Sequence, residues 1–378
     1  MRVVLACKAL VVEEYRRKLS AIAQQSDVDL IAVTPQSWQD PAYAIAFEQS
    51  PPMDYELVLT PLAFNGSYHL YFFPELPSIL DRFQPDLLHI DEEPYNLATF
   101  LATWQAARRR IPTVFFAWQN IVRRYPPPFR WMESYVFRIA RCGIGGTHAA
   151  ERALRTRGFK GPTAVIPQFG VDPERFAPPQ SKRPDGHQFT IGYAGRFVAE
   201  KGLLTLLRAA ARLPVDYRIV LIGDGPQRAQ LQALARELKI EDRLEIRDPV
   251  PSSSMPLLLH EFDVLVLPSI STVRWIEQFG RILVEAMASG VPVIGSTCGE
   301  IPGVIDDAGL VFDEGDEAQL CDALCKLAGD AGLRRDLSER GRKRVLDHYT
   351  HQRVAEETVG VYGKVLQQQG SLPPKRGR

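Results

Sequence analysis

The chain has 378 residues, and its 45 lysines and arginines balance 45 aspartates and glutamates to a formal net charge of zero. The length exceeds what one hydrophobic core usually supports, so we expect two domains of ordinary size. A chain without a basic excess lacks the electrostatic signature of a dedicated nucleic-acid binder, which favours small-molecule chemistry and predicts no nucleic-acid partner.

The five cysteines are thinly spread and show no disulfide-framework spacing, which indicates a reducing compartment. Cys321 and Cys325 are four residues apart, but no nearby His or Cys pair completes a zinc set. The apolar start at residues 1–6 is far shorter than a signal-peptide core, and no apolar stretch approaches membrane-spanning length. We therefore expect a cytoplasmic protein that is soluble or, at most, peripheral at the inner face of the membrane.

Short apolar segments alternate with longer helical patterns along the chain, and each short segment is an expected strand. They are residues 3–6, 30–33, 87–90, 113–117 and 164–166 in the first half, and 190–193, 217–222, 243–246, 264–267 and 291–295 in the second half. This alternation predicts an α/β protein with parallel, Rossmann-like sheets.

A stretch rich in proline and charge, residues 172–186, interrupts the alternation and indicates a domain boundary. Two α/β domains joined in this way leave a cleft at the carboxyl ends of both sheets, where open α/β folds bind ligands. The expected parts are an N-terminal domain at 1–170, a linker at 171–188, a C-terminal domain at 189–350, a helix at 351–369 and a disordered tail at 370–378.

The first chemical signal is a tight turn after the expected strand at 190–193. Gly195 and Arg196 form the turn, and Lys201 follows shortly before a helix that starts near Gly202. A diphosphate needs converging cations, and Arg196 offers a planar fork while Lys201 offers a point charge. Taken alone, the pattern also fits two solvated cations beside a helix.

A second strand ends in Gly223-Asp224-Gly225-Pro226. Its glycines would let a ligand approach the backbone closely, and Pro226 suits the first position of a helix. Many strand-to-helix turns have this composition, so the segment indicates a ligand site only in combination with the other two signals.

The third signal is a helix that starts at Phe279-Gly280 and stops at Gly290, with Glu277 before it and Glu285 inside it. The free amides and positive dipole end at its start suit a phosphate. The two carboxylates are roughly 12 Å apart if the segment is helical, so they could hold different parts of one elongated ligand. The alternative is two solvated glutamates without a ligand.

In this order the motifs resemble those of the family 4 retaining glycosyltransferases, which have the GT-B fold. The matching residues are Gly195-Arg196, Glu200-Lys201-Gly202, Gly223-Asp224-Gly225-Pro226, Pro268-Ser269, Glu277 to Glu285, Gly290-Val291-Pro292-Val293-Ile294 and Gly299-Glu300-Ile301-Pro302. The likeness covers about residues 190–312. It implies two facing Rossmann-like domains with an interdomain cleft, and a C-terminal helix that returns to the N-terminal domain.

The resemblance implies a retaining hexosyltransferase that uses no metal and no other cofactor. Its donor would be a UDP-sugar or GDP-sugar, and its partner an acceptor hydroxyl on a glycan, a glycolipid or a small molecule. The implied catalytic residues are Arg196 and Lys201, which hold the diphosphate, and Glu277, which contacts the sugar. The implied donor-binding residues are Gly195, Gly223, Asp224, Gly225, Phe279, Gly280, Arg281 and, at the ribose hydroxyls, Glu285.

Two other functions remain open at this point. One is a nucleotide-sugar epimerase of the same fold, and the other is a two-lobed sugar-binding protein without catalysis. The oligomeric state cannot be predicted from the sequence.

The N-terminal half departs from the family pattern, so acceptor contacts carry over poorly. Residues 7–13 contain no glycine where the family has a glycine-rich loop, and Asp91 stands where a second histidine is common. Gln119 and Asn120 replace a His-Asp pair, which puts a histidine base at that position in doubt. The candidate acceptor-side residues are His89, Asp91, Glu92, Glu93, Gln119, Asn120 and His148.

These acceptor candidates also have simpler interpretations. The acids at 91–93 could form a solvated loop, and His89 and His148 could be structural. The basic and aromatic stretch at 123–131, with Phe137, Arg138 and Arg141 after it, could contact an anionic membrane or acceptor, or could be an ordinary amphipathic surface helix.

Overall fold

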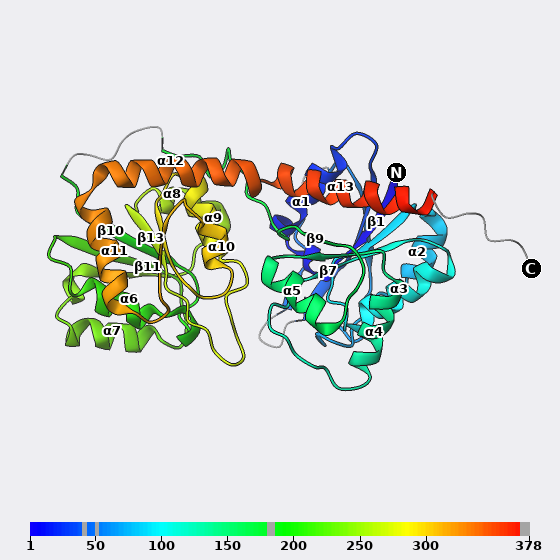
Figure 1. The fold of residues 1–378 in the computed structure, drawn as a ribbon, viewed down its shortest axis with the longest axis horizontal. Helices are drawn as coiled ribbons and strands as arrows, with labels where there is room; N and C mark the ends of the chain where they lie inside the picture. Colours follow the sequence, from blue (N-terminus) through cyan, green and yellow to red (C-terminus); the bar gives the residue numbers. More distant parts are fainter. Residues whose placement is uncertain (40–43, 50–52, 180–185, 371–378) are drawn as a thin grey trace, which may run out of the picture. The chain divides into compact units, whose positions relative to one another are not determined.

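The computed structural model describes residues 1–39, 44–49, 53–179 and 186–370. The chain forms two compact units (Figure 1). Unit 1 comprises Met1–Gly170 and the helix that begins at His351, and unit 2 comprises Val171–Thr350. Each unit is described by itself below.

Unit 1 is a seven-stranded parallel sheet with helices on both faces, in the order β5-β2-β1-β6-β7-β8-β9. Its strands are β1 (Arg2–Ala6), β2 (Asp29–Pro35), β5 (Glu56–Thr60), β6 (Leu87–Ile90), β7 (Thr113–Ala117), β8 (Cys142–Gly145) and β9 (Thr163–Val165), beside a short antiparallel pair, β3 (Ser37–Gln39) and β4 (Ala44–Ala46). Its helices are η1 (Lys8–Val11), α1 (Glu13–Ala23), α2 (Leu76–Phe83), α3 (Leu97–Arg108), α4 (Phe129–Ile139), α5 (His148–Arg157) and α13 (His351–Gly370).

The central strands of unit 1 are apolar on both faces, as a parallel sheet covered by helices requires. Along β1, Val4 and Ala6 enter one core cluster while Val3 and Leu5 enter the other. This is the two-residue alternation of a strand. Helix α13 packs beside α1 in the second cluster, so the last helix of the chain completes the core of unit 1 (Figure 1).

Unit 2 has a six-stranded parallel sheet in the order β12-β11-β10-β13-β14-β15. The strands are β10 (Phe189–Ala194), β11 (Tyr217–Ile222), β12 (Leu244–Arg247), β13 (Val264–Leu267), β14 (Val293–Ser296) and β15 (Leu310–Phe312). The helices are η2 (Ala199–Lys201), α6 (Leu203–Ala210), α7 (Arg228–Glu237), η3 (Glu241–Arg243), η4 (Ser252–Ser254), α8 (Met255–Leu259), α9 (Arg281–Ala288), α10 (Ile301–Ile305), α11 (Glu317–Gly329) and α12 (Ala331–His348).

Two Rossmann-like units with parallel sheets confirm the predicted α/β class, but several elements differ from expectation. The strands β5, β8 and β15 were not predicted, because β8 contains two glycines and β15 has only three residues. Helix α7 begins at Arg228, so Pro226 precedes the helix instead of opening it. The backbone N–H of Gln227 donates to the carbonyl of Phe197, which holds the chain outside the helix at this point.

Part of the expected linker is packed into unit 2. The Arg342 guanidinium donates to the carbonyl oxygens of Pro173 and Phe176, both at 2.8 Å, and Phe176 is buried. Val171 pairs with Thr350 in an isolated bridge, so the unit begins and ends at neighbouring residues. Gly370, the first residue of the expected tail at 370–378, belongs to α13, and residues 371–378 lie outside the described residues.

No helix within the described ranges is both long enough and apolar enough to cross a membrane.

Candidate functional site

A pocket of about 390 Å³ opens where β10, β11 and β12 of unit 2 end. Open α/β sheets bind ligands at the carboxyl ends of their strands, which is where this pocket lies. Its lining contains six residues that the sequence assigned to the donor, namely Gly195, Arg196, Gly223, Asp224, Arg281 and Glu285.

The glycine turns that form one wall of the pocket cannot accept side chains. Gly195, Gly223 and Gly225 have φ angles of 154°, 145° and 156°, in the region that favours glycine. A Cβ atom on Gly223 would lie 1.9 Å from the carbonyl oxygen of Gly195. The turns after β10 and β11 therefore pack backbone to backbone, which leaves the space beside them to a ligand.

Helix α9 contributes Glu285, one of the two acids that line this pocket beside Asp224. Glu285 is buried, and its Oε1 accepts a hydrogen bond of 2.8 Å from Nε of Arg281, one turn earlier on the same helix. Gly280 precedes the helix with a φ of 78°, and the buried Phe279 packs edge-on against Tyr349. Phe279 and Gly280, both predicted donor contacts, do not line the pocket, and a Cβ atom on Gly280 would meet the side chains of Leu267 and Leu283.

The second predicted acid, Glu277, belongs to a separate polar cluster in unit 2. Its Oε2 lies 2.5 Å from Nζ of Lys201 and accepts a hydrogen bond of 2.9 Å from the buried Ser269 hydroxyl. The Lys201 ammonium also lies 4.9 Å from the centre of the Trp275 ring. Lys201 and Glu277 therefore form a charge pair, and neither lines the pocket that contains Arg196 and Glu285.

Tyr193 lies between the pocket turn that carries Arg196 and the Lys201–Glu277 pair. Its hydroxyl donates a hydrogen bond of 2.9 Å to the carbonyl oxygen of Arg196. Burial, followed by the nearby charge of Glu277, raises the pKa of this hydroxyl, so Tyr193 remains a neutral donor. Tyr193 fixes the backbone of the turn that carries Arg196, a role that the sequence did not reveal because it depends on a contact rather than a motif.

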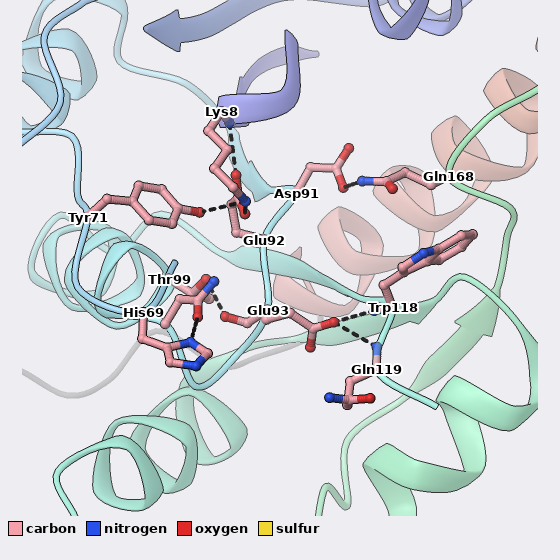
Figure 2. A network of polar contacts seen from close by, with 11 residues as sticks. Lys8, His69, Tyr71, Asp91, Glu92, Glu93, Thr99, Trp118, Gln119 and Gln168 are labelled. Carbon is pink, nitrogen blue, oxygen red and sulfur yellow. Dashed lines mark hydrogen bonds and ion pairs between the residues drawn. The ribbon is translucent and has the colours of Figure 1, made fainter. Parts of the chain in front are cut away.

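Asp91 and Glu92 in unit 1 are buried, and all three acids at 91–93 have internal hydrogen-bond partners (Figure 2). Glu92 accepts a hydrogen bond of 2.8 Å from the backbone N–H of Lys8 and pairs with its ammonium at 2.6 Å. Asp91 pairs with Lys18 at 2.5 Å and accepts a hydrogen bond of 2.9 Å from Nε2 of Gln168. Burial opposes ionisation of Asp91, but Lys18 and the other partners hold its pKa below the ordinary value.

Glu93 is held by backbone groups. Its Oε1 accepts from the backbone N–H groups of Trp118 and Gln119, at 2.6 and 2.7 Å (Figure 2). Burial raises the pKa of Glu93. These contacts tie the three acids to loops at the carboxyl edge of the unit 1 sheet, which does not fit a solvated loop, while Oε2 of Glu93 is buried without a hydrogen-bond partner among the described residues. A role of these acids toward an acceptor stays a prediction.

The remaining acceptor candidates are dispersed. His89 is buried, its Nδ1 lies 2.7 Å from the Tyr362 hydroxyl of α13, and burial lowers its pKa to about 4. His89 is therefore a neutral core residue. Gln119 donates from Nε2 to the Tyr125 hydroxyl at 3.3 Å, Asn120 is partly exposed, and His148 is exposed at the start of α5.

The sequence did not identify Lys8 and Lys18, the cations that pair with Glu92 and Asp91. It also did not identify His69, whose Nδ1 lies 3.3 Å from Oδ1 of Asn96. Lys8 lies two residues after the end of β1, at the carboxyl edge of the sheet, and this position in the sequence could have identified it. Across the described residues, no three His, Cys, Asp or Glu side chains come together as a metal site.

Comparisons with known proteins agree with this architecture. The chain matches the family described as Glycosyl transferases group 1 over residues 175–344 and the one described as Glycosyltransferase Family 4 over residues 12–175. It resembles the N-acetyl-alpha-D-glucosaminyl L-malate synthase of Bacillus anthracis, with 32% identity over 178 residues, 46% of this chain and 45% of that protein. It also resembles the lipopolysaccharide core biosynthesis glycosyltransferase LpsD of Rhizobium meliloti, with 27% identity over 293 residues, 71% and 81% of the two chains.

Solved structures share the fold at low identity. Anabaena HepE in complex with UDP has a TM-score of 0.73 and 16% identity, and the alignment covers 96% of this chain and 100% of that one. Sucrose-phosphate synthase from Thermosynechococcus elongatus has a TM-score of 0.71 and 20% identity, with 97% and 100% covered.

The two parallel sheets, together with these neighbours, define a protein of the GT-B class. The chain belongs to glycosyltransferase family 4, since the two family matches together extend from residue 12 to residue 344. It spans about half the length of the first curated relatives that it matches.

Proposed function

We propose that this chain is a retaining glycosyltransferase that moves a hexose from a UDP-sugar or GDP-sugar to an acceptor hydroxyl. The acceptor would be a glycan, a lipid-linked glycan or a small molecule. The observation that carries the proposal is the pocket of unit 2, which brings Arg196, Arg281 and Glu285 together beside two glycine turns.

The chemistry of the pocket suits a nucleoside diphosphate. The guanidinium of Arg196 would pair with the diphosphate, and the carboxylate of Glu285 would accept hydrogen bonds from two adjacent ribose hydroxyls. Arg281 holds Glu285 in the structure, so a ribose would share or replace that contact. Anabaena HepE, whose structures contain UDP and UDP-glucose, supports this class of donor.

The Lys201–Glu277 pair would act on the other end of the donor. Lys201 would stabilise the negative charge that grows on the leaving phosphate, and Glu277 would accept hydrogen bonds from the sugar. Because Ser269 and Lys201 both bind Oε2 of Glu277, the acid is oriented before any ligand arrives. The leaving phosphate would accept the proton of the attacking hydroxyl, as the family resemblance implies, and no metal is required by this scheme.

The proposal is tested by nucleotide release from a panel of UDP-sugars and GDP-sugars, with and without acceptor extracts. We expect release of UDP or GDP and formation of a glycoside of unchanged anomeric configuration. An altered sugar recovered from donor alone would instead establish an epimerase. Binding of donor without any turnover would establish a sugar-binding protein.

A further inference from the structure

A second charged pocket lies in unit 1, between the loop that precedes α4, helix α4 itself and the end of α5, and has a volume of about 330 Å³. Four arginines line it, and the single acid among its lining residues is Glu133. The arginines are Arg123, Arg124, Arg130 and Arg157. None of these residues belongs to the unit 2 site.

The rim of the pocket carries cations that face solvent. Arg124 and Arg130 are exposed, and neither side chain forms an ion pair or hydrogen bond with a described residue. Another exposed arginine of unit 1, Arg82, pairs with a surface acid, Glu56. Two guanidinium groups without such partners therefore remain available to an anion.

The floor of the pocket contains a buried cation with unused donors. The side chain of Arg157 is 3% exposed, and its Nη1 and Nη2 make no hydrogen bond within the described part of the chain. Nη1 lies 3.0 Å from Oε1 of Glu133, at an angle that gives no hydrogen bond. Buried guanidinium N–H groups without acceptors are costly, so an acceptor from a ligand would stabilise this arrangement.

Glu133 is a weak counter-charge to Arg157. Burial raises the pKa of Glu133 to about 7, against the opposing effect of Arg157. Near neutral pH a fraction of the Glu133 carboxyl groups is therefore protonated, and the protonated form is a hydrogen-bond donor. Four arginines therefore line the pocket against a single acid whose charge is weakened, and the Glu93 carboxyl is a further acid close enough to act on Arg157 and Glu133.

We propose that this pocket binds a phosphate monoester, with Arg157 at its floor and Arg124 and Arg130 at its rim. A phosphate monoester has three terminal oxygens and close to two negative charges, so it can engage several guanidinium forks at once, whereas a carboxylate has two oxygens and one charge. The volume leaves room for a small polyol beside the phosphate, since small-molecule sites begin at about 300 Å³. The inference uses unit 1 alone and stands whether or not the chain transfers sugars.

Calorimetric titration with glycerol 3-phosphate tests the proposal directly. It is carried out on the Arg196→Ala chain, because the unit 2 pocket is itself expected to attract phosphates. We expect saturable binding of one ligand per chain. Arg130→Gln should weaken it about tenfold, and the Arg124→Gln/Arg130→Gln pair about a hundredfold, because each lost bond to a charged group accounts for about one order of magnitude.

Arg138→Gln is the matched control, because Arg138 lies on the same helix, is exposed and does not line the pocket. It removes the same charge and should leave the affinity unchanged within about twofold. Glu133→Gln should tighten binding, since it removes the carboxylate that competes for Arg157. Equal weakening by Arg138→Gln and Arg130→Gln would overturn the proposal, since general charge attraction would then explain the binding.

The same variants distinguish a soluble phosphate from a lipid headgroup. Flotation with phosphatidylcholine vesicles that contain phosphatidic acid forms the second arm. Binding in either arm that depends on Arg124 and Arg130 but not on Arg138 supports the site, and the arm in which it occurs identifies the source of the phosphate. Absence of binding in both arms overturns the proposal, while nucleotide release by the unmodified chain would remain unaffected.

Discussion

The two units place buried acids at the same edge of similar sheets but expose them differently. In unit 2 the side chains of Glu277 and Glu285 keep 10% and 11% of their surface exposed, whereas Asp91 and Glu92 in unit 1 keep 1% and 4%. Each acid is paired with a Lys or Arg. The clearest contrast is between the Lys18–Asp91 pair, whose side chains are 7% and 1% exposed, and the Lys201–Glu277 pair, whose side chains are 15% and 10% exposed. The first pair is sealed inside unit 1, whereas the second keeps accessible surface.

The largest effect should come from breaking a sealed pair. Lys18→Met leaves the carboxylate of Asp91 buried without its cation, which should lower the free energy of unfolding by about 3–5 kcal/mol. Urea denaturation measures the change. Arg17→Met, on the same helix at a partly exposed pair with Glu14, should cost less than about 1 kcal/mol. Similar losses in both variants would contradict the structural role of the sealed pair.

The accessible pair should affect turnover more than stability. Glu277→Gln removes the charge that faces Lys201 and keeps the shape, so kcat for sugar transfer should fall about 10²–10³-fold. The free energy of unfolding should change by less than about 1.5 kcal/mol, the net value of a typical hydrogen bond. Glu317→Gln, which breaks a pair with Arg208 and Arg212 elsewhere in unit 2, is the control and should leave kcat unchanged. A Glu277→Gln enzyme with normal kcat would remove this acid from the site.

The sealed environment of unit 1 also predicts a pH dependence. The folded chain keeps His89 neutral down to a pKa of about 4, while in the unfolded chain the ring binds a proton near the ordinary value of 6.5. Protonation therefore favours unfolding, so the stability due to neutral His89 is complete above pH 6.5 and is lost as the pH falls to about 4. The loss should reach about 3 kcal/mol.

Unfolding free energies across this pH range, measured for the wild type and for His89→Gln, isolate the effect. The stability difference between the two should shrink on acidification, because glutamine does not titrate. His148→Gln, at an exposed position, should follow the wild-type curve. Parallel curves for the wild type and His89→Gln would show that this ring is not held neutral.

The smallest expected effect concerns Glu285 and appears in KM. Glu285→Gln keeps one acceptor but loses the charge, so KM for the donor should rise about tenfold with kcat nearly constant. Steady-state kinetics with varied donor measure both values. A fall in kcat as large as that of Glu277→Gln would mean that the two acids share one role rather than holding two parts of the donor.

The donor-side pocket was largely predictable because its signals are local. A Cβ atom on Gly223 would meet the backbone of Gly195, and one on Gly195 would meet the Tyr193 hydroxyl, so both positions favour glycine, which is visible in the sequence. The partners of the acids in unit 1 were not predictable, because Lys8 and Lys18 are separated from Glu92 and Asp91 by 84 and 73 residues. Patterns along a strand or helix predict elements, whereas pairing between distant side chains depends on the folded sheet.

The central claim is that the unit 2 pocket binds a nucleoside diphosphate, and calorimetric titration with UDP and GDP tests it most directly. We predict that one of the two binds the wild type and Arg138→Gln equally, and that Arg196→Ala weakens this binding about 10–100-fold. Equal binding by Arg196→Ala and the wild type, or no binding of either nucleotide by the wild type, would contradict the account.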